Sequence, residues 1–505
     1  MTKFDLRRAY KKFRNKMAEF DASELMNFCH AGLKIADSSV DVAGIREAPP
    51  WILLLFKKWI LLFGDWSGRG NRVQPRDFQY VYGKLVDCYS AVLPPRNKQE
   101  LFLFMRRSLG QQIPFQRPIF TYQLARQNIL FGGLFEDDKL RTGFEDFFQI
   151  NIQDFIELEL VMLAKFFDRQ DSHIVDDWFS PLKNSYAPNI MDRFLEIFSA
   201  NLAALKKFLK TEYDKHTPIM RHELFEMSPL RRFPLLREGA GCHCYSKRLL
   251  YISLSNFIYD SLRSLPDKGR IMSLWGNQFE NYVNKAISYS GLDYIAEAAL
   301  KKELGPNTKV VDFIISDSNY LVLVESKGVE MHYIAQVGFE SEDILAYLKS
   351  SIIDGIEQGY STIKNLHALK GNEGSGLEAP DKVFLVLVTY KELYIGNGNN
   401  LYNYIGKDEL DRIVRDYGNR RWIPFEHIFV MCIDDFELTL NCVIKGQVRL
   451  SQCLEIAAKS DSGVEIAELS FHRHLKKQKL VLDMPRYLRE EFLEIRGRIR
   501  PKFRT

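Results

Sequence analysis

Cysteine and long apolar runs are both scarce in this chain. Seven cysteines are scattered over 505 residues, from Cys29 to Cys453, and an odd, dispersed set is typical of a reducing cytosol and not of a disulfide scaffold. The most apolar stretch, residues 51–63, is interrupted by Lys57 and Lys58 and is too short to cross a bilayer. We therefore expect a cytoplasmic protein without a membrane partner, in which residues 51–63 form a buried helix.

A strong net charge is also missing, because the chain has 69 basic and 65 acidic residues and its net charge is only +4. This balance alone does not indicate a nucleic-acid partner. Residues 471–505 are locally basic, with eleven Lys or Arg and four acids, and so is a cluster formed by Arg7, Arg8, Lys11, Lys12, Arg14 and Lys16. Such stretches can contact phosphates, although a solvated helix face explains each of them as well. Residues 1–20 have no apolar core, so we expect no secretory signal.

Several familiar kinds of site have little support in the sequence. It contains no Walker-type glycine-rich loop and no nucleophile-elbow pattern, which argues against a built-in ATPase and a serine hydrolase. Cys242, His243 and Cys244 stand together, but Cys-x-Cys is shorter than the usual zinc-ligand spacing and no second ligand pair lies nearby. Asp434 and Asp435 follow an apolar run, and we interpret them as a turn or helix cap.

The length of the chain predicts two or more domains, since one hydrophobic core rarely serves 505 residues. Apolar residues spaced three and four apart predict helices through the first part of the chain, whereas runs of Val, Ile, Leu and Phe later on predict buried strands between helices. The expected class is α + α/β. The expected segments are a helical scaffold or interaction region (1–228), a strand-turn-strand-helix connector (229–270), an α/β domain (271–445) and a basic C-terminal segment (446–505).

Within the α/β domain, the apolar pattern predicts a series of elements. They are a helix at 274–289, strands at 309–316 and 320–326, a helical region at 344–369, a loop at 371–380, and strands at 383–389 and 428–432. The first two strands are apolar, yet each carries charge: Asp312 in one, and Glu325 and Lys327 in the other. A buried carboxylate is costly unless something pairs with it, so these residues are candidates for a site.

Strand geometry brings the charged residues together. Side chains alternate along a strand, so Glu325 and Lys327 share a face. If Ser318 and Asn319 form a two-residue hairpin loop, Asp312 lies opposite Glu325, with Cβ atoms about 5 Å apart. Two such acids repel each other unless a proton or a cation lies between them. Carboxylate oxygens suit Mg²⁺ or Mn²⁺.

The pattern of an acid on one strand and Glu-x-Lys on the next resembles the PD-(D/E)XK nuclease superfamily over roughly residues 271–440. The resemblance implies a restriction-endonuclease-like mixed sheet flanked by helices and Mg²⁺-dependent phosphodiester hydrolysis. By position, Asp312 and Glu325 match the two metal-binding acids, and Lys327 matches the lysine that orients water or neutralises developing charge.

Three further positions extend the resemblance. Glu280, in the helix before the strands, matches an additional metal-binding acid, and Gln358, in the helix after them, matches a polar site residue of some branches. The Ser326 carbonyl, between the acid and the lysine, could be another metal ligand. The sequence departs from the pattern at Val311, where proline would precede the first acid.

The resemblance implies an endonuclease acting on DNA, in antiviral defence against phage or in restriction. Three alternatives stay open: a catalytically inactive nucleic-acid-binding module, in which Lys327 forms only a structural ion pair with one acid; an interaction subunit of a multi-component defence system; and an RNA-cleaving toxin of the same fold. A protein partner, or a homo-oligomer formed through the helical region, is compatible with each of them.

Overall fold

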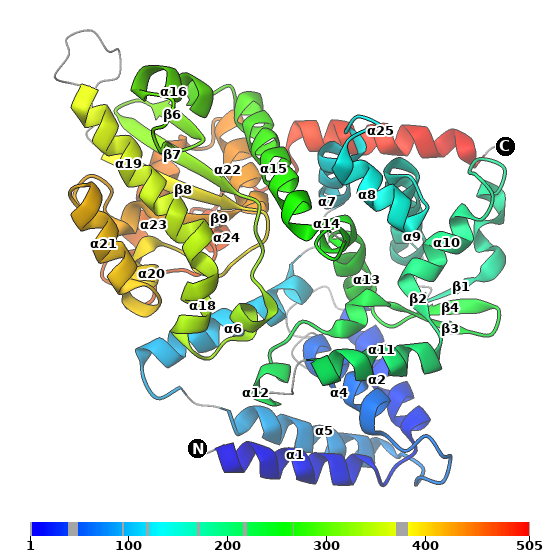
Figure 1. Cartoon of the computed structure of the whole chain (residues 1–505). Helices are drawn as coiled ribbons and strands as arrows, with labels where there is room; N and C mark the ends of the chain where they lie inside the picture. Colours follow the sequence, from blue (N-terminus) through cyan, green and yellow to red (C-terminus); the bar gives the residue numbers. More distant parts are fainter. Residues whose placement is uncertain are drawn as a thin grey trace. The chain divides into compact units, whose positions relative to one another are not determined.

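The computed structural model describes residues 3–38, 49–92, 95–117, 121–168, 172–215, 220–265, 267–369 and 382–503. Over these residues the chain is mostly helical with two sheets, which agrees with the expected α + α/β class (Figure 1). It divides into two compact units, each built from separated stretches of sequence. Unit 1 comprises Met1–Arg96, Gln111–Lys268 and Glu491–Thr505, and unit 2 comprises Asn97–Gly110 and Gly269–Glu490.

Unit 1 is a helical assembly with one small sheet. Its helices are α1 (Lys3–Met17), α2 (Ala22–Ser38), α4 (Pro50–Phe63), α5 (Pro75–Ser90), α7 (Tyr122–Gln127), α8 (Lys139–Phe148), α9 (Ile152–Asp168), α10 (Ile190–Phe198), α11 (Leu202–Lys215), α12 (Met220–Glu223), α13 (Lys247–Leu254) and α14 (Phe257–Leu262). The division between the units falls within α6 (Lys98–Gln116) and α25 (Arg486–Lys502).

Helix α4 is the buried helix expected from the apolar stretch, and its two lysines are accommodated inside unit 1. Lys58 Nζ lies 2.8 Å from Glu223 Oε2, and Trp59 donates a hydrogen bond of 2.9 Å to the same oxygen. The Lys57 ammonium lies 3.8 Å from the centroid of the Tyr245 ring. Both lysines therefore have partners, as buried charges require.

Among the described residues, no helix is long and apolar enough to cross a membrane.

The sheet of unit 1 has the order β1-β4-β3-β2, with β1 at His173–Val175, β2 at Ser199–Ala200, β3 at Leu235–Glu238 and β4 at Gly241–Cys244. The hairpin β3–β4 was expected, whereas β1 and β2 were not. In β4 the His243 ring contacts the His30 ring, with centroids 4.0 Å apart. Strand alternation directs Cys242 and Cys244 to the opposite face, so the Cys-His-Cys stretch does not present one ligand set.

Unit 2 contains the larger sheet and the expected site. Its helices are α15 (Lys268–Ser290), α16 (Glu297–Leu304), α17 (Tyr333–Val337), α18 (Ser341–Leu348), α19 (Asp354–Leu369), α20 (Gly398–Tyr404), α21 (Lys407–Tyr417), α22 (Ile433–Ile444), α23 (Leu450–Asp461) and α24 (Phe471–Lys477). Its strands are β5 (Tyr294–Ala296), β6 (Phe313–Asp317), β7 (Tyr320–Lys327), β8 (Lys382–Thr389) and β9 (Ile428–Cys432).

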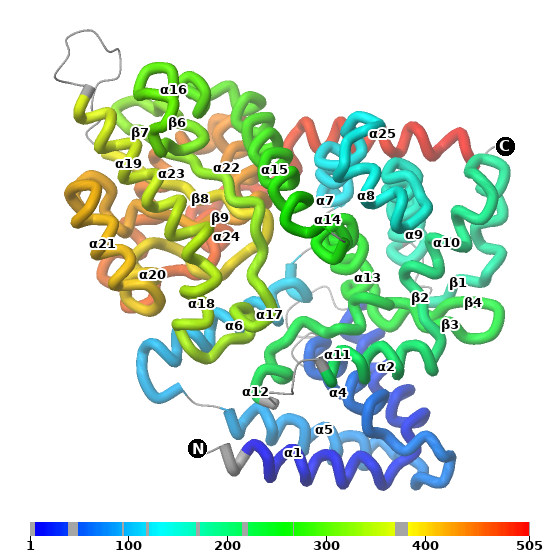
Figure 2. Tube along the Cα trace, in the orientation of Figure 1, coloured from blue at the N-terminus to red at the C-terminus, as the bar shows by residue number. Residues whose placement is uncertain are grey.

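The sheet has the order β5-β6-β7-β8-β9. The pairs β5–β6 and β6–β7 are antiparallel, and β7–β8 and β8–β9 are parallel. Helix α19 packs on β7 and β8, while α22 packs on β8 and β9 and α23 on β7. Figures 1 and 2 show α19 in front of the sheet and α22, α23 and α24 behind it. Burial on both faces explains why β8 is a continuous apolar run.

Some expected bounds differ from the structure. The helix expected at 274–289 begins at Lys268, and the first expected strand is shorter, because it begins at Phe313 and not at residue 309. The helical region at 344–369 consists of α18, a π-helical turn (Lys349–Ile353) and α19. The loop expected at 371–380 lies outside the described residues.

Candidate functional site

The register of the β6–β7 hairpin brings the expected residues together. Phe313 pairs with Val324, and Asp317 pairs with Tyr320, so Ser318 and Asn319 form the two-residue loop that the sequence predicted. Ser318 adopts a left-handed conformation, with φ of 59°, as such tight loops require. Asp312 immediately precedes β6, in the position that faces Glu325.

Backbone and side-chain hydrogen bonds join the two acids. The Asp312 amide donates to Glu325 Oε2 at 3.1 Å, and the Ser326 amide donates to Asp312 Oδ2 at 2.7 Å. The Ser326 hydroxyl contacts the same Asp312 oxygen. Ser326, expected to offer its carbonyl to a metal, thus also holds the Asp312 carboxylate through two donors.

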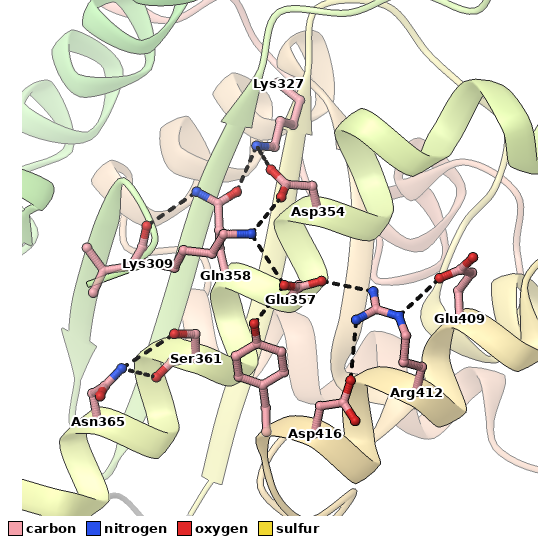
Figure 3. A network of polar contacts seen from close by, with 12 residues as sticks. Lys309, Lys327, Asp354, Glu357, Gln358, Ser361, Asn365, Glu409, Arg412 and Asp416 are labelled. Carbon is pink, nitrogen blue, oxygen red and sulfur yellow. Dashed lines mark hydrogen bonds and ion pairs between the residues drawn. The ribbon is translucent and has the colours of Figure 1, made fainter. Parts of the chain in front are cut away.

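Lys327 lies among three polar side chains. Its Nζ atom is 2.7 Å from Glu325 Oε1. It is also 2.9 Å from Gln358 Oε1 and 3.5 Å from Asp354 Oδ2, and Figure 3 shows these two contacts. The ion pair with Glu325 is the contact expected where Lys327 has only a structural role. It also fixes the ammonium on the same face as both acids, which is the position that a catalytic lysine requires.

Helix α19 brings Gln358 and Asp354 to the site because it approaches β7 closely. A Cβ atom added at Gly355 would lie 3.2 Å from Glu325 Cγ, 3.2 Å from Lys327 Cε and 2.8 Å from a Leu387 methyl carbon. Glycine therefore permits this approach, since a larger residue would overlap the sheet. Gln358 also donates to the Val310 carbonyl at 3.4 Å, next to the strand that Asp312 precedes.

The polar network continues along α19 to α21, as Figure 3 shows. Glu357 accepts hydrogen bonds from Arg412 at 2.9 Å and from Tyr417 at 2.7 Å, and both donors belong to α21. Lys309 lies 3.3 Å from Glu357 and 3.4 Å from Asp354. These contacts fix the helix that carries the partners of Lys327.

Glu280 lies on α15, which is attached to the end of β7. The Trp275 indole donates a hydrogen bond of 2.6 Å to the Gly328 carbonyl, directly after the lysine. Glu280 is half-buried, and burial together with the negative charges of Asp312 and Glu297 raises its pKa to about 7. The helix therefore places this carboxylate within electrostatic reach of Asp312.

The acids of the site hold protons more tightly than ordinary carboxyl groups do. Burial and the charge of Asp312 raise the pKa of Glu325 to about 8, against the opposing effect of Lys327. Burial also raises the pKa of Asp312, although the hydrogen bonds from Ser326 oppose it. For Lys327, burial lowers the pKa, but Glu325, Asp354 and Asp312 outweigh it and the pKa is raised. The carboxyl groups therefore resist full ionisation, because together they would carry more negative charge than one lysine offsets.

A divalent cation suits this excess of carboxylates, although the side chains are not arranged as a closed ligand shell. Both Glu325 oxygens are engaged, one by the Asp312 amide and one by Lys327. In the described part of the chain, the three side chains whose ligand atoms all lie within 4.8 Å of one another are Glu392, Cys432 and Asp435, not the acids of this site. A metal at Asp312 and Glu325 would therefore use the remaining lone pairs of these oxygens or take the place of Lys327 at Glu325 Oε1.

The structure adds Asp354, Gly355 and a side-chain role for Ser326 to the residues chosen from sequence. A signal for Gly355 was present: Gly355 and Gly359 are four apart, so they share one helical face, and Gly359 lies against Leu385 as Gly355 lies against Leu387. No comparable signal marks Asp354.

No protein-family model, curated protein or solved structure matches this chain.

Proposed function

We propose that unit 2 is a metal-dependent phosphodiesterase that cleaves nucleic acid, with DNA as the first substrate to test, and that its sheet is a restriction-endonuclease-like mixed sheet. The observation that carries the proposal is the clustering of Asp312, Glu325 and Lys327 on one face at the end of the β6–β7 hairpin. A buried acid pair with raised pKa values beside a fixed lysine is typical of a functional site and costly in a purely structural one.

Asp312, Glu325 and Glu280 would hold the cation, which we expect to be Mg²⁺ or Mn²⁺ because carboxylates are hard ligands. When bound, such an ion lowers the pKa of a coordinated water and offsets charge on a phosphoryl oxygen. Its charge would also replace that of Lys327 at Glu325, so the ammonium becomes available for substrate. Gln358 and Asp354 would then keep Lys327 at the site.

In this proposal Lys327 has one of two roles. It either orients the attacking water or neutralises the negative charge that develops on the phosphate. The Ser326 amide and hydroxyl hold the Asp312 carboxylate and would keep it oriented toward a bound ion.

The experiment is cleavage of plasmid DNA, single-stranded DNA and RNA by the full chain, with Mg²⁺ or Mn²⁺ and with EDTA. We expect metal-dependent cutting and a loss of about 10²–10³-fold in the Lys327→Met and Asp312→Asn variants. Lys309→Met is the matched control, because Lys309 also pairs with Asp354 but is half-exposed and does not contact the two acids. We expect it to retain activity within a few-fold.

The Lys327–Glu325 ion pair supports one second candidate, a nucleic-acid-binding module without catalysis. That candidate replaces the first if the wild type binds nucleic acid but cuts none of the three substrates with either metal. Cutting of RNA alone would instead favour the toxin alternative.

A further inference from the structure

A second group of metal-ligating side chains lies at the carboxyl ends of the parallel strands of unit 2. Cys432 is the last residue of β9, Asp435 lies in the first turn of α22, and Glu392 follows β8. We call these three residues the Glu-Cys-Asp cluster. Their ligand atoms all lie within 4.8 Å of one another. Cys432 and Asp435 are neighbours at the start of α22, and the parallel pairing of β8 and β9 brings Glu392 to them from a distant part of the sequence.

Cys432 and Asp435 are buried and Glu392 is partly buried, and α24 and the residue that precedes it support the cluster. Asp435 is 0% exposed and Cys432 is 2% exposed. His472 Nδ1 lies 3.3 Å from Asp435 Oδ1, and the His472 amide donates to Asp435 Oδ2 at 3.0 Å. The Ser470 hydroxyl lies 2.9 Å from Glu392 Oε2 and 3.4 Å from Asp435 Oδ2, which links the two carboxylates.

The donor types indicate which ion fits. Two carboxylates this close repel each other in a largely buried place, and the thiol beside them can bind a metal once it loses its proton, so a bound cation would stabilise the group. A thiolate favours a soft or borderline ion over Mg²⁺, and carboxylates together with a nearby imidazole are compatible with zinc. Ligands of a tetrahedral zinc ion lie about 3.5 Å apart, so the 4.8 Å limit is within reach of small side-chain rotations.

We propose that Glu392, Cys432 and Asp435 bind a zinc ion, with His472 as the positioning residue that orients Asp435. The ion would join the segment after β8 to the end of β9 and the start of α22. This is a separate site from the one at Asp312, because no residue is shared and the expected metal differs. The inference therefore holds or fails independently of the nuclease proposal.

Cobalt provides a direct spectroscopic test on the full chain. The protein is freed of metal with EDTA and titrated with Co²⁺, and absorption reports thiolate-to-cobalt charge transfer and tetrahedral geometry. We expect one such site per chain, displaced by Zn²⁺. Cys432→Ser should abolish the charge-transfer band. Cys442→Ser makes the same change at a buried cysteine of α22, the helix that follows Cys432, at a position outside the cluster, and should keep the band.

Two further variants make the result decisive. Glu392→Gln alters the least buried ligand, and we expect it to weaken Co²⁺ binding at least about tenfold even if Cys432→Ser does not fold. Asp312→Asn should leave the band unchanged. The proposal is overturned if the wild type gives no thiolate band, if the band survives in folded Cys432→Ser, or if Glu392→Gln binds Co²⁺ as tightly as the wild type.

Discussion

At the scale of single residues, Glu325 makes stability depend on pH in an unusual direction. Its pKa of about 8 in the folded chain exceeds the ordinary value of 4.5, because of burial and the charge of Asp312. Between these two values the folded protein keeps a proton that the unfolded chain has released. The stabilisation is therefore complete below about pH 4.5 and is lost as the pH rises through 8.

We therefore predict that Glu325→Gln flattens the pH dependence of stability between pH 5 and 8 in EDTA. For one proton the slope removed is about 1.4 kcal/mol per pH unit, measured as the free energy of unfolding in urea. Glu357→Gln is the control, because the pKa of Glu357 is shifted in the opposite direction. Hydrogen bonds from Tyr417, Arg412 and Lys309 outweigh burial and lower the pKa of Glu357 to about 2, so its contribution is lost only in acid. An unchanged slope in Glu325→Gln would contradict the raised pKa.

At the scale of elements, the approach of α19 to the sheet decides where the partners of Lys327 lie. We predict that Gly355→Ala and Gly359→Ala both destabilise the protein by about 1–3 kcal/mol, since each new methyl group would lie 2.8 Å from a leucine of β8. Only Gly355→Ala should also reduce cleavage, because its methyl group presses on Glu325 and Lys327.

Urea unfolding and cleavage kinetics on the same two variants separate the effects. Gly359→Ala serves as the control for Gly355→Ala. Both glycines face β8 from the same helix, but only Gly355 lies close to Glu325 and Lys327. Equal losses of activity in the two variants would mean that general loosening of α19, and not contact with the site, is responsible.

The same elements indicate what a sequence can and cannot predict. β9 lies at the expected residues 428–432, and the hairpin loop at Ser318 and Asn319 was fixed by the apolar runs on either side of it. Strands of two or three residues, such as β1 and β2, are too short to show an alternating pattern. They form because β1 pairs with the edge of β4 and β2 pairs with the edge of β3. These pairings depend on the tertiary structure, which the local sequence does not reveal.

The site divides in the same way. Asp312, Glu325 and Lys327 could be chosen because charge in an apolar strand conflicts with its surroundings, and strand alternation then placed them together. Asp435 was interpreted as a turn or cap, but it is fully buried and contacts His472 from a distant helix. A polar residue near a helix start is ordinary in sequence, so its partners become visible only when the fold brings α22 and α24 together.

At the scale of the whole molecule, the two basic clusters seen in the sequence differ in how far other residues of the protein neutralise them. In the C-terminal segment, Arg498 and Lys502 form ion pairs with the buried Glu157 of α9, and Arg473 and Lys477 pair with Glu468. These charges are partly neutralised within the protein. Their local excess in the sequence therefore overstates their availability to phosphate.

Helix α1 is different, because its apolar side is buried through Tyr10 and Phe13 while Arg7, Arg8, Lys11 and Lys12 are exposed. We predict that this basic face contacts the nucleic-acid backbone. Replacing all four residues with glutamine should then reduce the slope of log K against log salt by up to about 3.6, at about 0.9 per phosphate contact. Fluorescence anisotropy with labelled DNA at several salt concentrations measures the slope.

A control of equal charge separates a local contact from a general attraction. Replacing the exposed and scattered Lys139, Lys183, Lys207 and Lys285 with glutamine removes the same four charges from a net charge of +4. Because counterions are released only where phosphates are contacted, this variant should keep most of the wild-type slope. If both variants lose the same slope, long-range attraction by the net charge explains the binding, and α1 is an ordinary solvated helix.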